Sequence, residues 1–151
     1  MNNWYKEEAI AKLHTTFRGH VEDLLKEGAA EPVILCAAGN TPLFKALCEA
    51  LGEAEPQADK VAAFAMRGEQ AAELIDLCVS PGLGERLASI PAGEPGAFKL
   101  AYFEPGRALI RHLVYEGKDA VILVTVVLDL QRRTVAVTTD GKEWEEGPAD
   151  W

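Results

Sequence analysis

The fold is decided by residues 97–139, which read AFKLAYFEPGRALIRHLVYEGKDAVILVTVVLDLQRRTVAVTT. Pro105-Gly106 and Gly117-Lys118 are two-residue turn sequences between strand-like stretches, which predicts two successive β-hairpins, and residues 134–139 predict a fourth strand. Hairpin loop length fixes the pairing of the strands. The predicted pairs are Phe98–Leu113, Lys99–His112, Leu100–Arg111, Tyr102–Leu109, Leu113–Ile122, Arg111–Val124 and Leu109–Val126.

The third of these strands, residues 121–128, is almost wholly apolar. A strand without a polar face has to be covered on both sides, because exposed apolar area costs roughly 25 cal/mol per Å². Either the N-terminal helices divide between the two faces, or one face meets a partner. A homodimer is the favoured interpretation, since a contiguous apolar surface on a small domain usually marks an interface. The predicted interface residues are Phe103, Ile110, Val121, Leu123 and Val127.

The N-terminal part of the chain predicts helices, so the expected class is α+β. Apolar residues recur at the helical period over residues 3–26. A short strand is expected at residues 33–37, and a helix after Pro42. Residues 58–79 fit one long helix, or a strand at 61–66 followed by a helix; the weak strand propensity of the alanine-rich segment favours the single helix.

The expected organisation is one domain over residues 1–151, since 151 residues is about the length of one ordinary domain. Residues 1–95 are predicted to be mainly helical, residues 96–140 to form the β-meander, and residues 141–151 to form an acidic tail.

Composition restricts the classes of partner. The formal net charge of −9 disfavours binding to nucleic acid or to anionic membranes. The longest apolar run, residues 120–128, is too short for a transmembrane helix, and residues 1–8 do not resemble a signal peptide. Three cysteines in apolar contexts, without metal-ligand spacing, predict buried thiols in a cytoplasmic protein, and neither a metal nor a cofactor is expected.

Two places carry candidate chemistry. Asn40 and Thr41 precede a predicted helix, where free backbone N–H groups favour an anion, although ordinary helix capping explains the same residues. Lys99 and His112 face each other across the first hairpin, and a neighbouring lysine lowers the pKa of an imidazole and favours its neutral, basic form. A solvated lysine beside a buried histidine is the simpler interpretation of that pair.

The tail, residues 144–151, holds two tryptophans among acidic residues. It predicts either a docking peptide for a protein partner or a segment that folds back onto the sheet, and the second is favoured for Trp144. Two hypotheses follow. The first is a non-catalytic binding or assembly module that self-associates through an apolar sheet face. The alternative is a small enzyme that binds an anionic metabolite at Asn40 and Thr41, with His112 as the base.

Overall fold

The computed structural model describes residues 5, 7–29, 31–51, 61–89 and 94–149. Within these ranges the chain has the predicted α+β class, with five helices and seven strands. The helices are α1 (Glu7–Thr16), α2 (Arg18–Lys26), α3 (Pro42–Leu51), α4 (Gly68–Cys78) and α5 (Leu83–Ala88). The strands are β1 (Val33–Ala38), β2 (Val61–Met66), β3 (Phe98–Glu104), β4 (Arg107–Glu116), β5 (Asp119–Asp129), β6 (Thr134–Thr138) and β7 (Glu145–Pro148).

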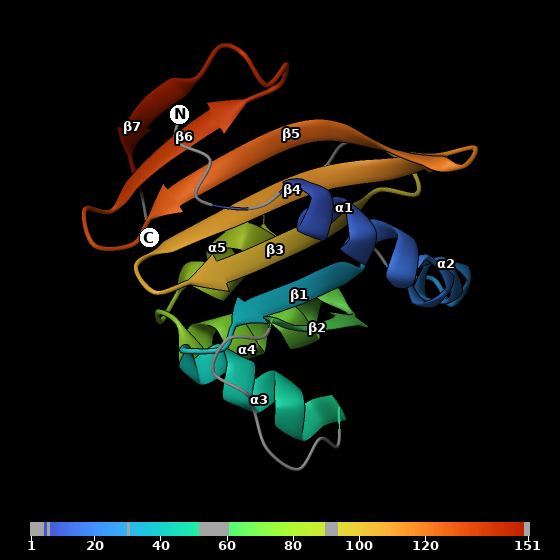
Figure 1. Cartoon of the computed structure of the whole chain (residues 1–151), viewed down its shortest axis with the longest axis horizontal. Helices are drawn as coiled ribbons and strands as arrows, with labels where there is room; N and C mark the ends of the chain where they lie inside the picture. The colour runs from blue at the N-terminus through green and yellow to red at the C-terminus, as the bar shows by residue number, and fades with distance from the viewer. Residues whose placement is uncertain (1–4, 6, 30, 52–60, 90–93, 150–151) are drawn as a thin grey trace.

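The strands form one sheet in the order β2-β1-β3-β4-β5-β6-β7 (Figure 1). The pairing of β1 with β3 is parallel, and the other described pairings are antiparallel. The sheet therefore has more strands than the predicted meander, because the N-terminal half adds β1 and β2 at one edge and the tail adds β7 at the other.

The register of the first hairpin is confirmed, with Phe98 opposite Leu113 and Lys99 opposite His112. The second hairpin begins as predicted, with Leu113 opposite Ile122. A register shift between His112 and Leu113 then lets Leu123 enter β5 as an extra residue. A bulge of this kind turns all later side chains to the other face of the strand.

The predicted pairs beyond the bulge are therefore wrong by one residue. Arg111 lies opposite Thr125 and not Val124, and Leu109 lies opposite Val127 and not Val126. Every residue in this segment of β5 except Thr125 is apolar, so the hydrophobic pattern gave no signal for the shift.

The single helix expected over residues 3–26 is two helices in the described range. Phe17 lies between them, with φ −98° and ψ 8°, outside the usual helical values. The chain changes direction there, so that α1 lies along the sheet and α2 runs in a different direction from α1 (Figure 1).

The favoured helix at residues 61–66 is also wrong, because these residues form β2. β2 pairs with β1 along its whole length. Four of its six residues are buried, and they include side chains on both faces of the strand. Three of these four are alanines, whose small side chains fit beneath helices on either face. Burial and pairing have overridden a weak local propensity.

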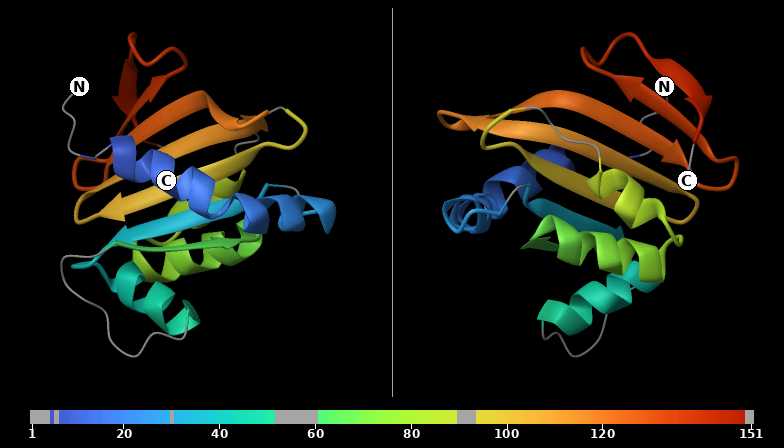
Figure 2. Two further views of the ribbon diagram at one scale, coloured as in Figure 1. Left: turned by 45° about the vertical axis from the view of Figure 1, so that its right-hand side comes forward. Right: turned by 180° about the vertical axis from the view of Figure 1, so that it is seen from behind.

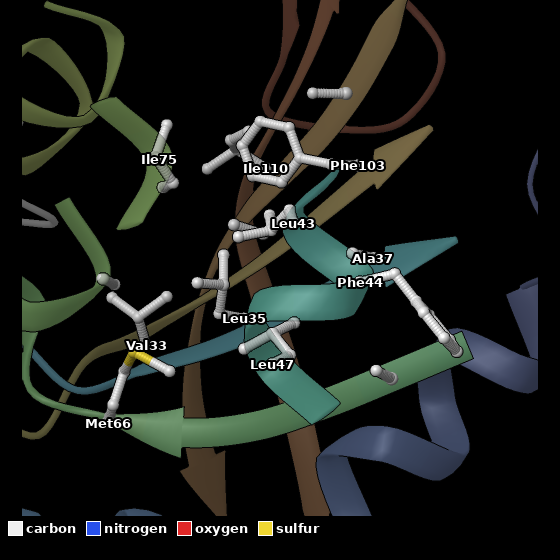
Figure 3. Close-up of a cluster of buried hydrophobic side chains, with 14 of the residues drawn as sticks. Val33, Leu35, Ala37, Leu43, Phe44, Leu47, Met66, Ile75, Phe103 and Ile110 are labelled. Atoms are coloured by element: carbon white, nitrogen blue, oxygen red, sulfur yellow. The ribbon is translucent and has the colours of Figure 1, made fainter. Parts of the chain in front are cut away.

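The helices divide between the two faces of the sheet, which is the intramolecular arrangement that the sequence analysis left open. α1 and α2 cover one face through Ile10 and Val21, and α3, α4 and α5 cover the other. In Figure 3, Leu43 and Leu47 of α3 lie beside Val33 and Leu35 of β1. On this second face the helices lie over the β1–β4 side of the sheet, and β5, β6 and β7 extend beyond them (Figures 1 and 2).

The tail folds back, as predicted for Trp144. β7 pairs with β6, and the half-buried indole packs against the core cluster on the α1–α2 face. Trp151 lies outside the described residues. None of the described helices is sufficiently long and apolar to cross a membrane.

Candidate functional site

Asn40 and Thr41 lie between β1 and α3, and Thr41 caps the helix. Its hydroxyl donates a hydrogen bond to the Ala38 carbonyl at 2.8 Å and accepts one from the Phe44 N–H at 3.2 Å. The Asn40 side chain is exposed. The geometry of Thr41 is that of ordinary helix capping, the structural alternative considered for these residues.

Lys99 and His112 are brought together as predicted, on the face of the sheet that α3, α4 and α5 cover. Lys99 is 5% exposed and His112 is 4% exposed. The Lys99 ammonium contacts the Glu31 carboxylate at 2.9 Å and donates a hydrogen bond to the Leu87 carbonyl at 2.9 Å. Lys99 is therefore a buried, paired lysine and not the solvated edge residue of the simpler interpretation.

His112 is a buried imidazole whose Nδ1 has no hydrogen-bond partner among the described residues. Burial lowers the pKa of His112, and the neighbouring Lys99 lowers that pKa further, while Glu31 acts in the opposite direction. The sequence predicts Lys99 as the cause of the lowered His112 pKa, but loss of solvation on burial is the larger effect. Both keep the imidazole in its neutral form near neutral pH.

A cavity of about 420 Å³ opens beside Lys99. Its walls are apolar side chains from α4, α5 and the sheet, among them Ile75, Leu87 and Ile110. Glu31, Arg67 and Glu69 supply its charged groups together with Lys99. A volume of this size is in the range of small-molecule sites.

The structure does not bring Asn40 and Thr41 to this cavity. In the parallel β1–β3 pair, Val33 lies opposite Lys99 and Ala37 lies opposite Phe103. Lys99 is therefore at the start of β3, whereas Asn40 follows the end of β1. With about 3.3 Å per residue, the two positions are separated by more than about 13 Å along the sheet. The anion site and base of the enzyme hypothesis do not converge.

A second buried polar cluster lies on the α1–α2 face. Arg111, 4% exposed, donates hydrogen bonds from both Nη atoms to the Glu7 carboxylate of α1, and these lower the pKa of Glu7. His14, also on α1, is buried, and its Nε2 has no partner in the described part of the chain. The sequence predicts the strand position of Arg111, opposite Leu100, but it gives no indication of its partner Glu7.

The residues predicted as interface are not all on the surface. Phe103 and Ile110 are 1% and 2% exposed, because α3, α4 and α5 cover them, so they belong to the core. Val127 is 9% exposed and faces the α1–α2 side beyond the bulge. Val121 is 36% exposed, and Leu123 is half-buried.

Glu31 and Arg67 were missed by the sequence analysis. Glu31 precedes β1 and reaches Lys99 only because β1 and β3 are parallel neighbours. Arg67 precedes α4, in a segment that was expected to be continuous helix.

Among the described residues, no cluster of three histidine, cysteine or acidic side chains is arranged to hold a metal ion. Comparisons with protein families, with curated proteins and with solved structures find no match to this chain.

Proposed function

We propose that this protein is a non-catalytic, cytoplasmic binding or assembly module that forms a homodimer through one face of its sheet. The free thiols of Cys36 and Cys78 support the cytoplasm as its compartment, because disulfides are rare there. The separation of Asn40 from His112 removes the geometric support for the enzyme hypothesis. A protein partner at the tail remains a prediction.

The observation that carries the proposal is a strip of valines beyond the helices on the α3–α5 face. Strand alternation and the bulge place these side chains on one face of β4, β5 and β6. Each is exposed or half-buried. This valine strip consists of Val114, Val121, Val124, Val126 and Val137.

A second copy is the simplest partner for the strip. An isologous contact pairs the same surface on both subunits and closes on itself, so it needs no other protein. The strip replaces the interface predicted from the sequence: Val121 is kept, while Phe103 and Ile110 are buried beneath helices and cannot contribute.

Light scattering on the purified chain tests the dimer. We expect the wild-type mass to be twice that of the monomer at micromolar concentration, and Val121→Glu to give a soluble monomer, because a carboxylate would lose its solvation in the interface. Leu77→Glu is the matched control, since Leu77 is 83% exposed on α4, away from the strip. It should leave the dimer intact.

A wild-type monomer at micromolar concentration would contradict the proposal. So would a dimer that survives Val121→Glu but dissociates with Leu77→Glu. Circular dichroism of each variant separates dissociation from unfolding, because a folded monomer keeps its far-ultraviolet spectrum.

A further inference from the structure

The cavity beside Lys99 has the properties of a small-molecule site that the proposed dimer does not use. It lies between α4, α5 and the covered part of the sheet, and its volume is about 420 Å³. Figure 3 shows two of its apolar residues, with Ile75 on the α4 side and Ile110 on the sheet. Such walls suit an apolar body of modest size.

A charged side chain lies deep in this cavity. Lys99 lines it and is 5% exposed, and lysines are almost never fully buried unless paired. An ammonium has three donors. The described contacts of Lys99 direct two of them to Glu31 and to the Leu87 carbonyl. The third donor is available to an acceptor in the cavity.

The first turn of α4 reaches the same cavity. Arg67, the residue before the helix, has extended backbone angles, with φ −68° and ψ 149°, and its side chain provides no capping hydrogen bond. Gly68 also lines the cavity, and it can do so only through its backbone. The partial positive charge at a helix N-terminus favours an anionic group there.

The acidic residues limit the charge of the ligand. Glu31 and Glu69 line the cavity with Arg67 and Lys99, so two acidic and two basic side chains balance. A single carboxylate fits this lining, because it needs only the third Lys99 donor and the backbone N–H groups of the first turn of α4, which have no acceptor within the helix. A polyanion such as a nucleotide would be repelled by the carboxylates of Glu31 and Glu69.

We propose that this cavity binds a small monocarboxylic acid with an apolar body. The carboxylate lies between Lys99 and the start of α4, and the apolar body packs against Ile75, Leu87 and Ile110. Arg67, whose side chain is 44% exposed, closes the charged end of the cavity toward solvent.

Amide chemical shifts of the full-length chain test the site with phenylacetate as the probe and phenylacetamide as its uncharged match. We expect saturable shifts at Gly68, Gly84 and Ala101 with phenylacetate, and binding at least about tenfold weaker with the amide, because hydrogen bonds to charged groups are the stronger ones. Equal binding of the two probes, or shifts that do not saturate, would overturn the proposal.

Arg67→Gln tests the charged end of the site and, at an exposed position, should not disturb folding. It should weaken phenylacetate binding about tenfold and leave phenylacetamide binding unchanged. Arg107→Gln is its matched control: Arg107 is 47% exposed and pairs with Glu104 at 3.3 Å, as Arg67 pairs with Glu27 at 3.4 Å. Equal effects of the two variants would show that binding responds only to net charge, and would refute the site.

Lys99→Met with Glu31→Gln removes the buried pair together, so that neither charge is left without its partner. This double variant should lose the preference for phenylacetate over phenylacetamide. If it folds and keeps that preference, Lys99 does not hold the carboxylate. If it does not fold, the comparison of Arg67→Gln with Arg107→Gln still tests whether the cavity binds the carboxylate.

Discussion

His14 shows at the scale of one residue what burial does to a titratable group in this protein. The imidazole is 6% exposed. Burial is the largest cause that lowers the pKa of His14 to about 4, and the nearby Arg111 adds to the effect, while Glu7 opposes it. His112 on the opposite face of the sheet has a pKa shifted in the same direction, also mainly by burial. Both histidines are therefore neutral in the folded protein near neutral pH.

This arrangement predicts that stability falls when the solution is acidified. The unfolded chain protonates its histidines below about pH 6.5, whereas folded His14 accepts a proton only near pH 4. Between these values the unfolded state binds more protons, so the free energy of unfolding decreases as the pH falls. For His14 the full effect is up to about 3 kcal/mol.

Urea unfolding at about pH 7 and about pH 5 measures this change. His14→Gln should lose less stability between the two pH values than the wild type does. His20→Gln is the control, because His20 is exposed, and it should keep the wild-type dependence. A His14→Gln variant with the full wild-type pH dependence would contradict the assignment.

At the scale of elements, α4 and α5 approach each other at a glycine. A Cβ atom built on Gly84 would lie 2.1 Å from the Ala72 carbonyl oxygen, which is backbone and cannot turn aside. The Asp76 carboxylate also accepts a hydrogen bond from the Gly84 N–H at 2.6 Å and so fixes the start of α5. These contacts hold α5 against α4 beside the Lys99 cavity.

Gly84→Ala should therefore destabilise the protein by about 2 kcal/mol or more, because a methyl group forced into a packed contact displaces backbone. Gly19→Ala in α2 is the matched control, since nothing lies within 4 Å of a Cβ atom there. That substitution should be neutral or stabilising by up to about 1 kcal/mol, through helix propensity. Denaturant unfolding of both variants gives the comparison, and equal stabilities would show that α5 moves away without cost.

At the scale of the whole molecule, one sheet joins the two halves of the chain. β1 from the N-terminal half lies between β2 and β3, so the sheet does not separate at residue 95. Both core clusters include side chains from β1, β3 and β4. β1, β3 and β4 therefore cannot separate from one another without exposing apolar residues of both clusters.

The chain should consequently unfold as one cooperative unit, in agreement with the prediction of a single domain. Far-ultraviolet circular dichroism reports the helices and strands, and the fluorescence of the tryptophans, including half-buried Trp144, reports tertiary packing. The two transitions in urea should coincide. A first transition seen only by fluorescence would instead show that the β6–β7 end unfolds separately.

The sequence alone determined the local features of this protein. The turn at Pro105-Gly106 fixed the β3–β4 register and placed Lys99 opposite His112, because a tight turn leaves one pairing. Tertiary structure decided the remainder. The β5 bulge lies in a run of apolar residues that the hydrophobic pattern does not distinguish. β2 is a strand because β1 pairs with it and helices on both faces of the sheet bury it. Glu31 contacts Lys99 only because β1 and β3 are parallel neighbours. These features depend on contacts between distant segments, which local patterns do not encode.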